Sequence, residues 1–213
     1  MALMGASIAY FRCGHYGSAL EYSAKLIALA DEKGGSFWKA QGMSNEGCVL
    51  SALGKPSQAL SLMTNALSMS RAIGAKIHVP GLLSEIATAN AETGRFDEAW
   101  RCIAEAEVMI EETKERWIEA EIHRTAGEIL LKSQARDETK ALSYFERAIV
   151  IAEKQQAKSW KLRAAMSMAR LWREQGKRDE ARELLAPVYG WFTEGSDTRD
   201  LKEAKALLDE LAA

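Results

Sequence analysis

Apolar and small residues recur along this chain at the spacing of helix faces. After three successive turn regions they fall at positions i, i+4 and i+7, as Ala59, Met63 and Ala66, as Ala99, Ile103 and Ala106, and as Ala141, Phe145 and Ala148. This spacing places each trio on one side of a helix. We therefore predict that the helix after each turn buries this row against the helix before it, so that the chain is built of helical hairpins.

The hairpins form a repeat with a nearly constant period. A Gly followed five residues later by Ala occurs as Gly14/Ala19, Gly54/Ala59, Gly94/Ala99 and Gly176/Ala181, in steps of 40, 40 and 82 residues. The last step fits two units of 41, and the unit without its Gly is marked by Ala135 and Ala141. Seven residues before each Gly stands a small residue, namely Ser7, Gly47, Ala87 and Ala169, with Ala126 in the irregular unit. Units of this length cannot bury an apolar face alone and must stack on their neighbours.

The predicted fold is all-α: a right-handed superhelical solenoid of five hairpins and a carboxy-terminal capping helix, forming one domain over residues 1–213. The hairpins are expected at about 1–34, 36–74, 76–114, 116–156 and 158–193, and the capping helix at 198–212. Asp200 and Glu203 have the spacing of a capping box, and Leu201, Ala204, Leu208 and Leu211 form an apolar stripe. The first hairpin has no such cap, so we expect a preceding segment or self-association through it.

These spacings resemble the tetratricopeptide repeat (TPR). The shared pattern is a small residue, a Gly seven later, an Ala five after that and another small residue seven further on. The units here are 40 to 41 residues long instead of about 34 and lack the closing Pro, and longer helices explain both differences. The resemblance implies a scaffold that binds partners.

Two segments carry a closer resemblance. Residues 115–131 read ERWIEAEIHRTAGEILL, and residues 157–211 read AKSWKLRAAMSMARLWREQGKRDEARELLAPVYGWFTEGSDTRDLKEAKALLDEL. Both resemble the carboxy-terminal region of bacterial multidomain signalling proteins, which join a class III adenylate or guanylate cyclase, or another output domain, to an AAA-type ATPase. Ser196 departs from the aromatic residue common there. The resemblance implies a carboxy-terminal fragment or a stand-alone relative, with any cyclase or ATPase activity in upstream domains.

Composition fits a folded protein without an electrostatic reason to bind nucleic acid or an anionic membrane. The net charge is −2, and 47% of residues are hydrophobic. Charge is uneven: seven acids face two bases over 105–121, and eight bases face three acids over 158–182. Three cysteines at no metal-ligand spacing indicate reduced thiols, and we expect a cytoplasmic protein because no secretory signal or long apolar stretch is present.

No motif for catalysis, a cofactor or a metal emerges. Gly34, Gly35 and Ser36 lack the Lys of a phosphate-binding loop, and no strand pattern could hold cyclase carboxylates. His123 follows Glu119 by one helical turn, but two ligands are too few for a metal site. We instead expect ion pairs among Glu119, Glu121, Arg124 and Glu128 along one helix.

Six tryptophans first suggest an aromatic ligand site. Trp38, Trp117 and Trp160, however, recur at the same place in three units. A residue that repeats with the fold serves the fold, so we favour packing for these side chains.

A partner would lie along the first helices of the hairpins, at positions that do not repeat. Counted from the small residue, these are three before, one after and four after. The candidate residues for binding a partner at these positions are Ser44, Cys48, Ser84, Thr88, His123, Arg170 and Arg173, and Arg163 is added because it lies one turn earlier on the same face.

The three arginines could clamp the carboxylates of an acidic peptide, or they could pair with Glu174, Asp179 or the capping helix. The predicted function is a non-catalytic protein-interaction or regulatory scaffold. The alternative is a sensor that binds a small effector in its concave groove, which would require a closed pocket. An enzyme would require several titratable groups converging in one cleft, and the sequence indicates no such convergence.

Overall fold

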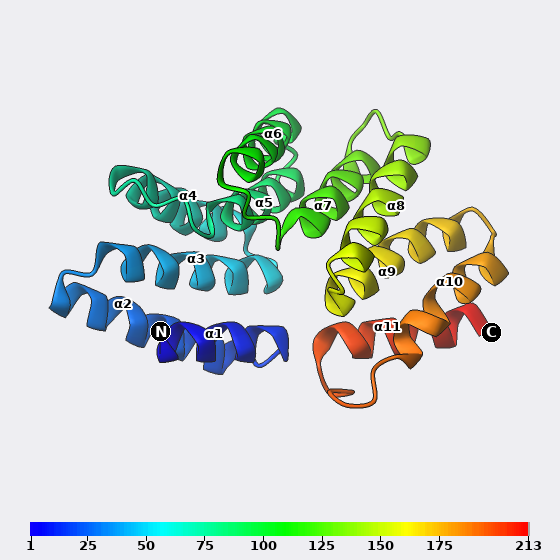
Figure 1. Cartoon of the computed structure of the whole chain (residues 1–213), viewed down its shortest axis with the longest axis horizontal. Coiled ribbons are helices and arrows are strands. Elements are labelled where there is room, and N and C mark those ends of the chain that lie inside the picture. The colour runs from blue at the N-terminus through cyan, green and yellow to red at the C-terminus, as the bar shows by residue number, and fades with distance from the viewer. Residues whose placement is uncertain (213) are drawn as a thin grey trace. The chain divides into compact units, whose positions relative to one another are not determined.

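The computed structural model describes residues 1–212, and every regular element within them is a helix (Figure 1). Their contacts divide the chain into two compact units, Met1–Glu115 and Arg116–Ala213, which are described separately. The all-α prediction is confirmed. Superhelical handedness and continuity of the array across residue 115 stay predictions.

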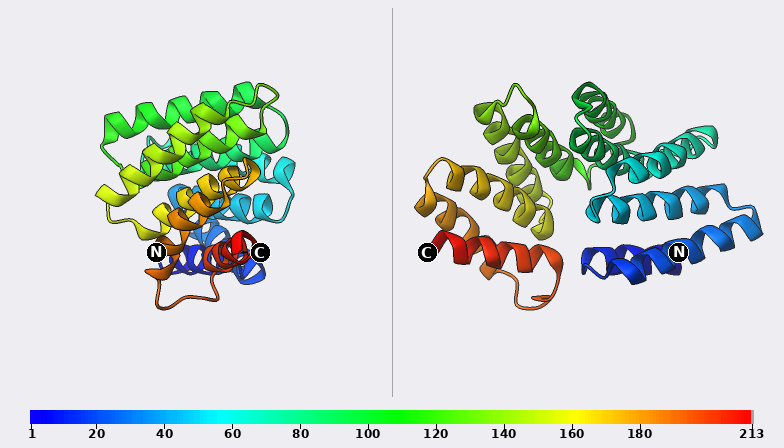
Figure 2. Two further views of the ribbon diagram at one scale, coloured as in Figure 1. Left: turned by 90° about the vertical axis from the view of Figure 1, so that its right-hand side faces the viewer. Right: turned by 180° about the vertical axis from the view of Figure 1, so that it is seen from behind.

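Unit 1 consists of three consecutive helical hairpins. They pair α1 (Ala2–Arg12) with α2 (Tyr16–Lys33), α3 (Ser36–Ala52) with α4 (Pro56–Ala72), and α5 (Val79–Glu92) with α6 (Phe96–Thr113). The second helices α2 and α4 also pack on the hairpin that follows each of them, and the first helices α1, α3 and α5 contact one another in turn. Figure 2 shows the same stacking from behind.

Unit 2 consists of two hairpins and a final helix. The hairpins pair α7 (Glu119–Lys132) with α8 (Glu138–Lys154) and α9 (Lys158–Glu174) with α10 (Arg178–Gly190). The final helix, α11 (Arg199–Ala212), packs on both α9 and α10. It is thus a cap on the last hairpin, as predicted.

The repeated positions form the core of both units. The alanines five residues after each turn and the small residues seven before it are buried; Ala19, Ala59, Ala99, Ala141, Ala181, Ala87, Ala126 and Ala169 have an exposed fraction of 0%. Met63, Ile103 and Phe145, from the middle of the predicted rows, are also 0 to 2% exposed. The predicted seam is therefore confirmed.

The hairpin turns depend on backbone conformation as much as on burial. Gly54 and Gly94 have positive φ angles of 72° and 75°, a region that side chains with a Cβ rarely adopt. The irregular unit turns without Gly: α7 ends at Ser133 in an extended conformation, and the Asp137 carboxylate accepts a 2.9 Å hydrogen bond from the Lys140 amide to cap α8. An Asp cap thus starts α8 where the repeat lacks its glycine.

Three details differ from the prediction. The third and fourth hairpins begin at Val79 and Glu119, because the preceding residues form turns; Pro80 would clash with a helix extended before it. Asp200 lies inside the first turn of α11 and is not its cap, so the predicted capping box is wrong. On the buried stripe of α11, Leu207 is 3% exposed while Leu208 is only partly buried.

Candidate functional site

The first helices of unit 1 carry four of the predicted binding residues, and three of them remain partly exposed. Ser44 and Cys48 lie on α3, and Thr88 lies on the neighbouring α5. The Ser51 hydroxyl donates to the Glu92 carboxylate at 3.3 Å, which joins the same two helices. We call Ser44, Cys48, Ser51, Thr88 and Glu92 the α3–α5 face. Most of its side chains are small and polar.

Neighbouring residues affect the chemistry of two side chains of this face, those of Cys48 and Thr88. Burial, followed by the Glu85 carboxylate, raises the pKa of the Cys48 thiol well above its usual value. A thiol with a raised pKa is a poor nucleophile at neutral pH. The Thr88 hydroxyl donates to the backbone oxygen of Ser84 at 3.1 Å, so part of its hydrogen-bonding capacity is used locally.

Ser84 and His123 do not face outward, and that part of the prediction is wrong. Their exposed fractions are 4% and 6%, and Met166, at the same position in the fifth hairpin, is 3% exposed. A residue three positions before the small core residue lies only about 60° from it around the helix, on the same buried side. Ser44, at this position in the second hairpin, is nevertheless partly exposed. The position one after the small residue lies about 100° away from it, and Cys48 and Thr88 at that position are partly exposed.

His123 is held by its own hairpin. Arg147 Nε donates to His123 Nε2 at 3.1 Å, and the Tyr144 ring stacks on the imidazole with 6.0 Å between centroids. Burial and the positive charge of Arg147 lower the pKa of His123 to about 4, so the ring is neutral at pH 7. Glu119 pairs with Arg116 at 2.8 Å, and residues 1–212 contain no group of three metal-ligating side chains.

The three predicted arginines lie on α9, and each faces a carboxylate. Arg163 pairs with Glu121 of α7 at 2.6 Å and lies 3.8 Å from Asp200 of α11. Arg170 pairs with Glu203 at 3.1 Å, and Arg173 pairs with Glu210. The sequence left two interpretations of these arginines, binding of an acidic peptide or pairing within the chain. The structure shows them paired within the chain, with acids of the capping helix α11 among their partners.

Glu121 is the buried centre of this charge network. It is 5% exposed and accepts two hydrogen bonds of 2.9 Å from Arg124 in addition to its pair with Arg163. Glu128 accepts from the Ser167 hydroxyl at 2.6 Å and pairs with Arg124. The predicted ion pairs of Arg124 with Glu121 and Glu128 are thus confirmed. We call the charged residues of α7, α9 and α11 that pair in this way the ion-pair ladder: Glu121, Arg124, Glu128, Arg163, Arg170, Arg173, Asp200, Glu203 and Glu210.

The tryptophans of unit 2 differ in how far they are buried. Trp117 and Trp160 lie 6.5 Å apart, and Arg163 lies 5.5 Å above the Trp160 ring. Trp117 is nevertheless 44% exposed and Trp191 56% exposed, with Lys158 above the Trp191 ring. Trp117 is thus not a core residue, but its contact with Trp160 of the next hairpin is packing between repeats.

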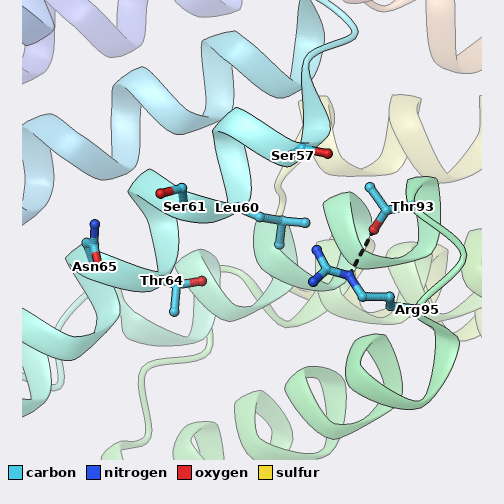
Figure 3. A pocket seen from close by; sticks show the side chains of 7 residues that line it. All are labelled: Ser57, Leu60, Ser61, Thr64, Asn65, Thr93 and Arg95. Atoms are coloured by element: carbon cyan, nitrogen blue, oxygen red, sulfur yellow. Dashed lines mark hydrogen bonds between the residues drawn. The ribbon is translucent and has the colours of Figure 1, made fainter.

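Sequence reasoning missed a polar hollow on unit 1 (Figure 3). It has a volume of about 550 Å³ and lies beside α4, which contributes Ser57, Leu60, Ser61, Thr64 and Asn65, while Thr93 and Arg95 come from the turn between α5 and α6. Arg95 Nε donates to Thr93 Oγ1 at 3.2 Å. The row of hydroxyls on α4, spaced for one helix face, was the signal in the sequence that could have indicated it.

The first hairpin exposes several large apolar side chains, of which Met1 and Leu29 are 85% and 46% exposed. On α1, Ile8 and Tyr10 are 38% and 37% exposed, and the Tyr10 ring stacks on Tyr22 with 5.3 Å between centroids. None of the helices in residues 1–212 is both long and apolar enough to cross a bilayer.

Solved structures similar to this chain contain TPR-like repeats. One is a kinesin light chain protein of Podosopora anserina with nearly identical TPR-like repeats, at 16% identity and a TM-score of 0.55, covering 98% of this chain and 94% of that one. A variant of it matches at 17% identity and a TM-score of 0.59, covering 89% and 92%. BtubC (BKLC) from P. vanneervenii matches at 16% identity and a TM-score of 0.59, covering 94% and 88%. No protein-family model and no curated protein matches the chain. At these identities the likeness shows the fold, which is that of TPR-like repeats.

Proposed function

We propose that this chain is a non-catalytic protein-interaction scaffold whose α3–α5 face binds an extended segment of a partner protein. One observation carries the proposal. The positions that repeat are buried in the core, whereas Ser44, Cys48 and Thr88, which differ between units, stay partly exposed on adjacent helices. In a repeat fold the accessible, varying positions are the ones free to specify a partner.

The ion-pair ladder changes how an acidic partner would bind. Arg163 is 17% exposed, while Arg170 and Arg173 are 39% and 34% exposed, and all three already face carboxylates. An acidic peptide therefore reaches them only in competition with the acids of α11. Binding of a partner at these arginines remains part of the proposal, but it requires that their ion pairs with the carboxylates of the chain be broken.

The context we propose is a bacterial multidomain signalling protein, of which this chain is the carboxy-terminal region or a relative. The segments that support this, 115–131 and 157–211, contain α7 and α9 to α11, which carry the ion-pair ladder. Any cyclase or ATPase chemistry would then belong to upstream domains. A cytoplasmic location is part of the same proposal.

The alternative, binding of a small effector, requires an enclosed pocket. The hollow beside α4 is open to solvent, and five of its seven lining residues are exposed. This geometry favours a peptide over a small molecule that must be largely enclosed.

The test is a pull-down from bacterial lysate, read by mass spectrometry. Ser44→Arg and Thr88→Arg place a long cation on the α3–α5 face, and Ser68→Arg places the same side chain on the exposed side of α4 as the matched control. We expect one partner to be lost with the first two variants and kept with the control. Capture of the same partner by all variants with unchanged helical circular dichroism would overturn the proposal.

A separate arm reverses the charge of Arg163, Arg170 and Arg173 to Glu. Loss of a partner in this arm supports recognition of acidic segments only if thermal unfolding shows that α11 stays in place. Unchanged capture removes the arginines from the proposal.

A further inference from the structure

Arg95 differs from most arginines of the chain in its electrostatic environment. Most of the other arginines pair with carboxylates, such as Arg71 with Glu105 at 2.5 Å and Arg101 with Glu98. Within residues 1–212, Arg95 pairs with no acid, and the one hydrogen bond of its guanidinium is to the Thr93 hydroxyl. Its guanidinium is thus available to an anion from outside the chain.

The walls of the hollow leave that guanidinium unopposed. None of the seven lining residues is acidic. The nearest acids in sequence, Glu92, Asp97 and Glu98, all lie outside the lining; Glu92 accepts a hydrogen bond from Ser51, and Glu98 is engaged by Arg101. A guanidinium pairs carboxylate or phosphate oxygens through two parallel hydrogen bonds, which makes it selective for these groups.

The opposite wall supplies hydrogen-bonding groups for a peptide backbone. Ser57, Ser61, Thr64 and Asn65 are exposed, and their side chains make no hydrogen bond to any other described residue. Figure 3 shows them along α4, with Arg95 and Thr93 on the turn across from them. Hydroxyls and an amide can both donate and accept, as the alternating groups of an extended peptide require.

We propose that the hollow beside α4 is a second binding site, which takes the acidic side chain of an extended peptide, with Arg95 pairing its oxyanion and the α4 hydroxyls bonding its backbone. A glutamate or aspartate carboxylate is the expected group, and a phosphorylated serine would supply the same oxyanion chemistry. The site uses α4 and the α5–α6 turn and does not depend on the α3–α5 face, so either proposal can fail alone.

The test is a titration of the ¹⁵N-labelled whole chain followed by backbone amide chemical shifts. The probes are acetyl-Gly-Glu-Gly-Glu-Gly-amide, its counterpart with Gln for Glu, its counterpart with phosphoserine for Glu, and inorganic phosphate. Arg95→Gln removes the guanidinium. Arg182→Gln is the matched control, because Arg182 is also exposed and has no ion pair within the described residues.

We expect saturable shifts at Ser61, Thr64 and Thr93 with the glutamate peptide. Affinity should fall at least about tenfold in Arg95→Gln, stay unchanged in Arg182→Gln, and be lost with the glutamine peptide. Tighter binding of the phosphoserine peptide would support the site and identify phosphate as the preferred oxyanion. Equal affinity of wild type and Arg95→Gln, equal binding of the glutamine peptide, or binding of inorganic phosphate alone would overturn the proposal.

Discussion

The close approach of the two helices in a hairpin should depend on the absence of a side chain at Gly127. A Cβ added there would lie 2.4 Å from Cε1 of Phe145, 2.8 Å from its Cδ1 and 2.9 Å from its Cζ. Phe145 is fully buried, with an exposed fraction of 0%, so its ring has little room to move. Gly127→Ala therefore forces either the ring or the α7–α8 pair to shift.

Two opposing effects set the magnitude. Replacing Gly by Ala inside a helix stabilises it by about 1 kcal/mol, whereas overpacking a filled core costs about 1–3 kcal/mol. The expected net result is a loss of about 1 kcal/mol. Gly5→Ala is the matched control, because a Cβ added at Gly5 meets nothing within 4 Å and should show the gain alone.

The assay is urea unfolding followed by circular dichroism. We expect the midpoint of Gly127→Ala to fall below that of wild type and the midpoint of Gly5→Ala to rise above it. Adding Phe145→Leu should reduce the cost of the new methyl group, because it removes the ring that the methyl meets. Equal stabilisation by Gly127→Ala and Gly5→Ala would refute the reasoning about hairpin packing.

Three further changes test unit 2. Glu121→Gln leaves Arg124 and Arg163 without their buried carboxylate and should lower the free energy of unfolding in urea by about 3 kcal/mol. Glu119→Gln, at a more accessible carboxylate, should lower it by less than about 1 kcal/mol. Similar losses for both variants would contradict the ion-pair ladder. The pKa of His123 is about 4 in the folded chain and 6.5 in the unfolded chain, so the unfolded chain binds the proton first as the pH falls. The free energy of unfolding should therefore decrease by up to about 3 kcal/mol between pH 6.5 and 4. His123→Gln should lack this part of the pH dependence in matched titrations. Leu207→Ala should cost about 2–4 kcal/mol and Leu208→Ala clearly less, because Leu207 is the more deeply buried; the reverse order in thermal unfolding would contradict the register of α11.

The hairpins were predictable from sequence because their physical requirement repeats. Four of the five hairpin turns use a Gly with positive φ, as at Gly54, and each seam needs a small residue, as at Ala59. The helix starts were less predictable. The turn before Val79 follows from Pro80 alone, while nothing comparable marks the start at Glu119.

The surface was harder to predict, because exposure depends on which face of a helix its neighbours cover. Ser84 and His123 have polar side chains, yet their helix positions lie beside the core residue and are buried. The pairing of Arg173 with Glu210 joins residues that the repeat pattern does not relate, since α11 stands outside the repeat. The hollow beside Arg95 likewise arises where helix α4 and the α5–α6 turn of the next hairpin are brought together by stacking.

Site-specific photo-crosslinking tests the central claim, binding of a partner on the α3–α5 face, most directly. A photoreactive phenylalanine analogue is placed at Ser44 or Thr88, and at the exposed Ala104 of α6 as control. The account predicts that one partner crosslinks from both Ser44 and Thr88 and not from Ala104. Crosslinking from Ala104 with none from Ser44 or Thr88 would contradict it.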